Sequence, residues 1–104
     1  MREDRLETLR RMAEDRPDDA RLWFGLAVEL LNRGETQEGS NALRVYLGLA
    51  EDDGNGWGRL GAALAELGDA AGARRAYTQG IEIATRRGHR GLAEELQDAL
   101  ESLA

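Results

Sequence analysis

The amino-acid sequence predicts an all-α fold, a short α-solenoid of about five antiparallel helices. Apolar residues recur at three- and four-residue spacings along the chain, which places them on one face of a helix. A segment that begins at Trp23 returns after 34 residues at Trp57, so one structural unit is used twice. Val and Ile nowhere alternate with polar residues at a period of two, and no strand is expected.

Each copy of the repeated unit has two halves. The first halves read Trp23-x-x-Leu26-Ala27-x-x-Leu30 and Trp57-x-x-Leu60-Gly61-x-x-Leu64. In the second halves, Gly39-x-x-x-Leu43 corresponds to Ala73-x-x-x-Tyr77. The large residues of one helix and the small residues of the other should let two helices approach closely in each unit.

This pattern resembles the tetratricopeptide repeat, whose units are pairs of antiparallel helices with the same period. The resemblance covers residues 18–87 closely and both flanks loosely. It implies a single domain over residues 1–104, with repeats at 18–53 and 54–87. The segment 1–17 then corresponds to the second half of an incomplete unit, and 88–104 to a capping helix.

Capping residues mark where the helices of the repeats should begin and end. The first repeat is expected to form helices over about 19–33 and 35–52, separated by Gly34. Asn55 is the expected N-cap of the helix that carries Trp57.

The flanking segments are also expected to be helical. The first helix should cover about 2–16, and the last should begin at about Arg90. An apolar stripe on the last helix would cover the second repeat; it consists of Leu92, Leu96, Leu100 and Leu103. The neighbouring cations Arg86, Arg87 and Arg90 are interpreted as offsetting the negative end of a helix dipole.

Glycines inside the predicted helices oppose folding, because each costs roughly 0.5–1 kcal/mol relative to alanine. They are Gly25, Gly39, Gly48, Gly58, Gly61, Gly72 and Gly80. Replacing Gly48 or Gly72 by alanine is therefore expected to raise the melting temperature. An unchanged or lower value would indicate that the glycine serves close packing instead.

Composition limits the classes of function. The net charge of −6 disfavours nucleic acid as a partner, because phosphate binding needs a clustered positive surface. The chain has no cysteine, which excludes disulfides and thiolate chemistry. No apolar run approaches the length of a membrane span, so no membrane association is expected and the cytoplasm is the default location.

No enzymatic site is expected. Gly56-x-Gly58-x-x-Gly61 matches a dinucleotide-binding fingerprint as text, but that loop must follow a strand, and here a helix precedes it. A calcium loop that begins at Asp53 would place apolar residues where oxygen ligands are required, so turn and capping chemistry is the simpler interpretation. His89 is the only imidazole. The sequence therefore predicts no catalytic residue, no metal site and no cofactor.

The resemblance implies that the protein is a non-enzymatic adaptor that binds another protein or peptide segment. Tetratricopeptide arrays bind such segments on the concave surface formed by the first helix of each unit. The residues expected to face that groove lie between the packing positions of the first helices: Arg21, Phe24, Val28, Leu31, Asn32, Asn55, Arg59, Ala62, Ala65 and Glu66. The carboxylate clamp of the family members that bind chaperone tails is absent, because Phe24, Val28, Gly58 and Ala62 occupy its positions.

Two alternatives remain open at this stage. The apolar groove strip, or the open edge beside the incomplete unit, could instead be buried in a homodimer. Phe24 and Leu31 could also pack against the terminal helices and leave no apolar groove at all.

Overall fold

The computed structural model describes residues 4–103, and α-helix is the only regular secondary structure over that range. The helices are α1 (Arg5–Asp15), α2 (Ala20–Asn32), α3 (Thr36–Leu49), α4 (Asn55–Glu66), α5 (Ala70–Arg86) and α6 (Arg90–Glu101). The all-α prediction is confirmed, and the described helices number six where the sequence predicted about five. The expected start of the first helix at residue 2 lies outside the described residues.

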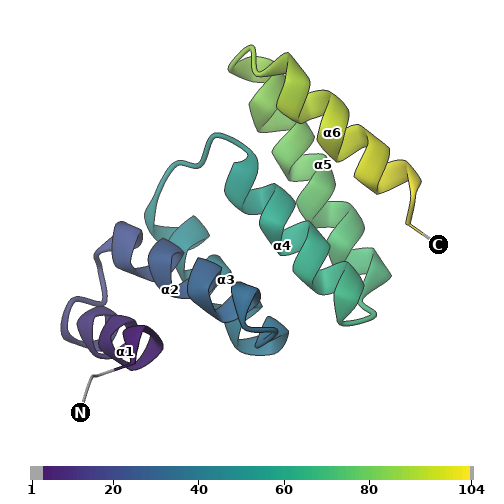
Figure 1. Ribbon diagram of the computed structural model, residues 1–104. Helices are drawn as coiled ribbons and strands as arrows, with labels where there is room; N and C mark the ends of the chain where they lie inside the picture. Colours follow the sequence, from purple (N-terminus) through teal and green to yellow (C-terminus); the bar gives the residue numbers. More distant parts are fainter. Residues whose placement is uncertain (1–3, 104) are drawn as a thin grey trace. The chain divides into compact units, whose positions relative to one another are not determined.

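The chain divides into two compact units, Met1–Ala50 and Glu51–Ala104. In the first unit, α2 pairs with α3 and α1 packs on α2 (Figure 1). In the second unit, α4 pairs with α5, and α6 packs along α5 and also touches α4. Each of the two predicted helical hairpins therefore forms, and the stacking of one repeat on the other stays a prediction.

Three of the helices end in the same way. Gly34, Gly68 and Gly88 follow α2, α4 and α5 with φ angles of 79°, 84° and 75°, a conformation that residues with a Cβ rarely adopt. After each glycine, a backbone N–H donates to the carbonyl of the residue five positions earlier, at 2.8–2.9 Å. This geometry satisfies carbonyls that the helix end would leave unpaired. The predicted stops at Gly34 and Gly68 are confirmed.

The start of α4 differs from the prediction. Asn55 is the first residue of the helix and not its N-cap, so that prediction was wrong. The capping acceptor is the buried carboxylate of Asp52, which accepts backbone N–H groups from Gly54, Gly56 and Trp57 at 2.9, 2.8 and 3.2 Å. Sequence proximity favoured Asn55, but an acceptor two residues before the cap position reaches more of the unpaired donors.

A small residue faces a large one inside the second hairpin. A Cβ at Gly61 of α4 would lie 2.7–3.0 Å from ring carbons of Tyr77 on α5, closer than van der Waals contact allows. Leu60 and Leu64 are buried beside them, while the Trp57 side chain is half-buried. The first hairpin uses Ala27 in the place of Gly61, and Ala27 is fully buried.

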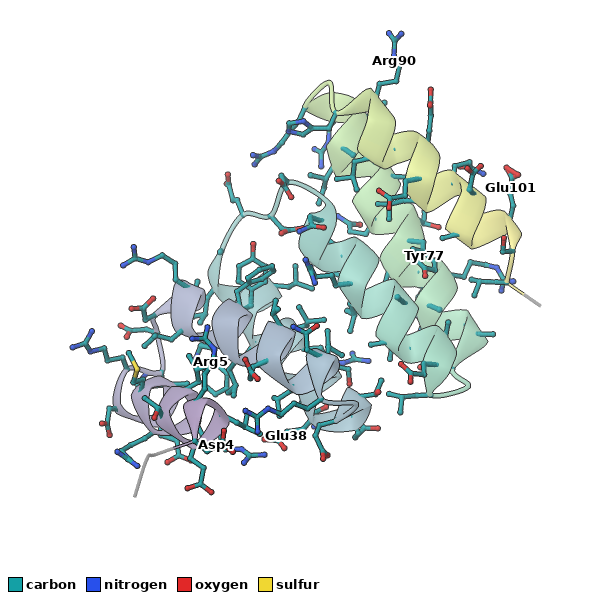
Figure 2. The ribbon with its side chains drawn as sticks, in the orientation of Figure 1. Asp4, Arg5, Glu38, Tyr77, Arg90 and Glu101 are labelled. Atoms are coloured by element: carbon teal, nitrogen blue, oxygen red, sulfur yellow. The ribbon has the colours of Figure 1, made fainter. Side chains whose placement is uncertain are left out.

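Charged side chains hold α1 against the hairpin of the first unit. Arg33, which follows α2, donates to both carboxylate oxygens of Asp4, the N-cap of α1, at 2.9 and 2.6 Å. Glu29 of α2 accepts from Arg33 and from Arg5 of α1, each at 2.9 Å. Figure 2 labels Asp4 and Arg5 in this unit.

A second link joins α1 to α3. Arg10 donates to both carboxylate oxygens of Glu38, at 2.9 and 2.5 Å. This hydrogen bonding lowers the pKa of Glu38 below its ordinary value, and the hydrogen bonds from Arg33 lower the pKa values of Asp4 and Glu29 in the same way. Because these carboxylates bind protons less readily in the folded state, they stabilise it at neutral pH and lose that effect in acid.

The structure predicts different effects for the alanine substitutions at Gly48 and Gly72. A Cβ at Gly48 of α3 meets no atom within 4 Å, whereas a Cβ at Gly72 of α5 would overlap the Asp69 carboxylate that caps this helix by accepting the Gly72 N–H at 2.9 Å. Gly48→Ala should therefore raise the free energy of unfolding by roughly 0.5–1 kcal/mol. Gly72→Ala should leave it unchanged or lower it, because the cap must move. Thermal unfolding of both variants tests this, and equal stabilisation would contradict it.

Acid should release α1 before the hairpins unfold. The folded-state pKa values of Asp4, Glu29 and Glu38 lie below those of the unfolded chain, so their stabilising effect is lost as the pH falls below about 4. Amide NMR signals of α1 should then shift at higher pH than those of α4 and α5. The charge-free variant Arg10→Gln/Glu38→Gln serves as the control and should show a weaker acid transition. Simultaneous loss of all signals would contradict this prediction.

Candidate functional site

The residues predicted to face the groove lie in both units, on α2 and α4. In the first unit they are Arg21, Phe24, Val28, Leu31 and Asn32, all on α2. In the second unit they are Asn55, Arg59, Ala62, Ala65 and Glu66, all on α4.

The apolar residues of α2 pack within their own hairpin. The Phe24 ring lies 4.9 Å from the Tyr46 ring of α3, centroid to centroid, at an interplanar angle of 60°. The Leu31 side chain covers Gly39 of α3, where a Cβ would lie 2.7 Å from Leu31 Cδ2. Both side chains are half-buried. They therefore support the α2–α3 pair, which is a different partner from the terminal helices considered above.

The polar residues at the two ends of α2 are exposed to solvent. Arg21, at the start of the helix, has a side chain that is 95% exposed, with Asp19 3.9 Å away. Asn32, at the end, is exposed as well, and Val28 between them is half-buried. An adaptor surface on α2 would therefore offer a cation at one end, an amide at the other and partly covered apolar groups between them.

In the second unit, α4 and α6 enclose a groove of about 330 Å³. Three of the predicted residues line it: Asn55, Arg59 and Ala62. Leu92, Glu95, Leu96 and Ala99 of α6 form the opposite wall, and Gly58 and Tyr77 complete the lining. Ala65 and Glu66, one turn further along α4, lie outside this lining.

Leu96 is the principal α6 residue in the groove, and it fits into a notch made by two glycines. A Cβ at Gly58 would lie 2.6 Å from Leu96 Cδ2, and a Cβ at Gly80 would lie 2.8 Å from Leu96 Cδ1. Leu96 is 5% exposed, and it is the one buried residue of α6 among those described. We call Gly58 and Gly80 the glycine notch.

The repeat period explains why this notch exists. One period before Gly58 and Gly80 stand Phe24 and Tyr46, whose rings contact each other in the first unit. Sequence reasoning placed Leu96 on an apolar stripe but missed the notch. Comparing the two repeats position by position would have shown that two aromatic residues are replaced by two glycines.

The chemistry of the groove suits recognition of a polypeptide. Its lining combines apolar side chains with one cation, Arg59, and one carboxylate, Glu95. Burial raises the pKa of the Tyr77 hydroxyl, so this ring is neutral at physiological pH. Within residues 4–103 there is no group of three or more His, Cys, Asp or Glu side chains that could hold a metal ion.

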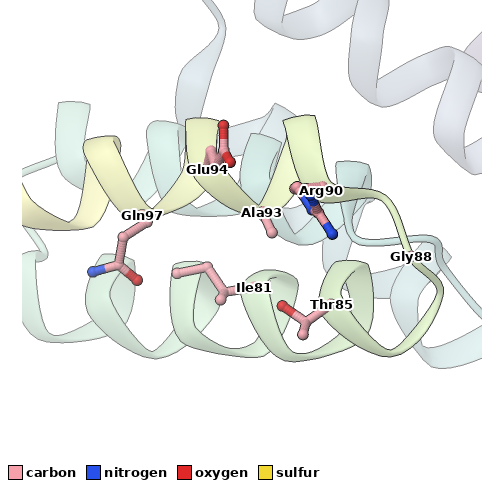
Figure 3. A pocket seen from close by; sticks show the side chains of 7 residues that line it. All are labelled: Ile81, Thr85, Gly88, Arg90, Ala93, Glu94 and Gln97. Carbon is pink, nitrogen blue, oxygen red and sulfur yellow. The ribbon is translucent and has the colours of Figure 1, made fainter.

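A second groove of about 360 Å³ lies between α5 and α6 (Figure 3). Ile81 and Ala93 supply apolar surface, while Arg90, Glu94 and Gln97 project from α6 around it. None of these residues was predicted to bind a partner, and Arg90 was interpreted only as a cation near a helix end.

Comparison with known proteins shows a similarity that extends over almost the whole chain. A TPR repeat-containing protein of Pseudomonas aeruginosa is 32% identical over 98 residues, which is 94% of this chain and 93% of that protein. No family model matches the chain. Among the residues that the structure describes, no helix is both long and apolar enough to cross a membrane.

Proposed function

Because the chain belongs to the tetratricopeptide-repeat family, we propose that it is a non-enzymatic cytoplasmic adaptor that binds a protein segment or a partner domain. The contact surface is the exposed face of the first helices of the repeats, α2 and α4. Family membership supports protein binding in general. The choice of surface is supported by the groove beside α4.

The observation that carries this proposal is the coincidence of two independent features on α4. Asn55, Arg59 and Ala62 occupy the positions that the repeat pattern assigns to the binding face, and the same three residues line the groove. An apolar side chain of a partner would fit against Ala62, and a partner carboxylate could accept hydrogen bonds from Arg59.

On α2, the same proposal gives the residues different tasks. Phe24 and Leu31 are committed to packing against α3, so a partner meets only their uncovered edges. Arg21 and Asn32 are exposed and can orient a bound segment. Truncating Phe24 would therefore confuse binding with stability, and α4 provides the cleaner test.

Homo-oligomerisation is the alternative function, and exposed apolar residues on α3 favour it. Val45 and Leu49 are one helical turn apart and are 37% and 43% exposed. A second copy of the chain could bury them. Sedimentation at low micromolar concentration separates the two functions, since a strict monomer would remove the alternative.

Ala62→Arg should weaken partner capture about tenfold or more, because a long cation would fill the groove beside α4. The measurement is the amount of protein retained from a lysate of the source cells by the tagged, immobilised chain. The matched control is Ala71→Arg, which makes the same change at an exposed position of α5 away from the groove.

Both variants must retain the helicity of the parent chain, which circular dichroism measures. Arg59→Glu should weaken the capture of acidic partners more than the capture of neutral ones. Capture that survives Ala62→Arg as well as it survives Ala71→Arg would contradict the assignment of the binding face to α4.

A further inference from the structure

We propose that α6 is a displaceable occupant of the binding face of the second unit, and that the partner presents an amphipathic helix whose leucine replaces Leu96 in the glycine notch. This inference rests on the proposed function, because it identifies the kind of partner that the α4 surface takes. It also assigns a regulatory contact to the chain itself, since α6 and the partner would compete for one notch.

The attachment of α6 is almost wholly apolar. The side chains of α6 within the described residues form no hydrogen bond or ion pair with α4 or α5. Their two side-chain hydrogen bonds, from Gln97 to Glu101 at 3.4 Å and from Ser102 to the Asp98 carbonyl at 2.9 Å, stay within the segment. Leu96 is the one buried side chain of α6, and Leu92, one turn earlier, packs over Gly54. Docking therefore depends on apolar contacts.

The contrast with the other end of the chain is direct. There α1 is tied to α2 and α3 by hydrogen-bonded ion pairs that involve Arg5 and Arg10. No equivalent link restrains α6 within the described residues. A helix with one buried side chain and no polar links to its neighbours has two features of the segments that open at low free energy.

The local sequence of α6 also contributes little to the stability of the helix. Its N-cap, His89, makes no side-chain capping hydrogen bond, and Gly91 lies in the first turn, where a Cβ would meet nothing within 4 Å. A helix of 12 residues is marginal in water when it has no tertiary contacts. Release of Leu96 should therefore release the rest of α6.

Undocking extends the surface that the proposed function uses, because it vacates the notch beside the exposed residues Asn55 and Ala62. Gly58, Tyr77 and the α4 residues Arg59 and Ala62 line the groove between α4 and α6, and Gly80 of the notch lies against Leu96. The notch admits a branched apolar side chain only because both positions lack a Cβ. The occupant seen in the structure thus acts as a template for the partner.

The template defines the chemistry of the partner. In α6, Leu92 and Leu96 are spaced one helical turn apart, and both line the groove. Glu95, which precedes Leu96, lines it from the same helix. The partner helix should carry leucines four residues apart and a carboxylate beside the inserted leucine, within reach of Arg59.

A peptide in trans tests this model with the full chain. The probe is a fluorescently labelled peptide of residues 88–104, added to the variant Leu96→Asp, whose own α6 cannot re-enter an apolar notch. The peptide should bind this variant at least tenfold more tightly than it binds the parent chain, in which the tethered helix competes at high effective concentration.

Two matched changes identify the notch as the site. The same peptide with Leu96→Ala, and the double variant Gly58→Ala/Leu96→Asp with the unchanged peptide, should each weaken binding at least tenfold. Binding that is insensitive to both changes, or no binding to a helical Leu96→Asp chain, would overturn the proposal.

Hydrogen exchange of the parent chain decides the matter if Leu96→Asp does not fold. The amides of α6 should exchange together and at least tenfold faster than those in the middle of α4 and α5. Equal protection would overturn the proposal, because α6 would then open only with the whole unit. If α6 is protected equally but Ala62→Arg still weakens partner capture, the adaptor function is retained and only the displacement of α6 is contradicted.

Discussion

The rest of the structure depends on the close approach of two helices within each hairpin. In the second unit this approach is possible because Gly61 leaves room for the Tyr77 ring, which would otherwise lie within 3 Å of a Cβ. In the first unit the buried Ala27 holds the equivalent position. Short separation lets large side chains on one helix fill the spaces on the other, and interiors packed in this way tolerate little change in volume. The first helix of each pair is thereby fixed with its opposite face directed away from its partner, where recognition residues can be placed.

The two units have similar helical hairpins, but different residues at equivalent positions give them different properties. At two corresponding positions the first unit has Phe24 and Tyr46, whose rings contact each other. The second unit has Gly58 and Gly80, which have no side chains to make such a contact. The missing volume is supplied by Leu96 from another helix. A void of this kind would be costly if it stayed empty, because its lining would lose contacts on one side. The second unit therefore requires an apolar occupant beside these two glycines, and in the structure that occupant is Leu96.

The sequence was sufficient for features that depend on local chemistry. The Trp23–Trp57 period gave the two hairpins, and the glycines after α2 and α4 gave their ends, because a left-handed residue at a helix end is a requirement of the backbone. It was insufficient where a residue's role depends on distant contacts. Asn55 had suitable capping chemistry, but the buried Asp52 carboxylate caps α4. Phe24 matched a groove position, yet its ring packs on Tyr46, since a half-buried aromatic residue can serve either face. The notch around Leu96 joins three helices, and no single window of sequence contains it.

The two terminal helices respond to different conditions, because different forces hold them. The ion pairs of α1 are exposed, so salt screens them and acid removes their carboxylate charges. The attachment of α6 depends on burial of Leu96, which neither salt nor mild acid weakens directly. An apolar competitor can displace α6 by replacing Leu96 in the glycine notch. It cannot displace α1 in the same way, because α1 is held by ion pairs. The proposed displacement of α6 by a partner is therefore compatible with a stable first unit, because the glycine notch can be vacated without loosening α1.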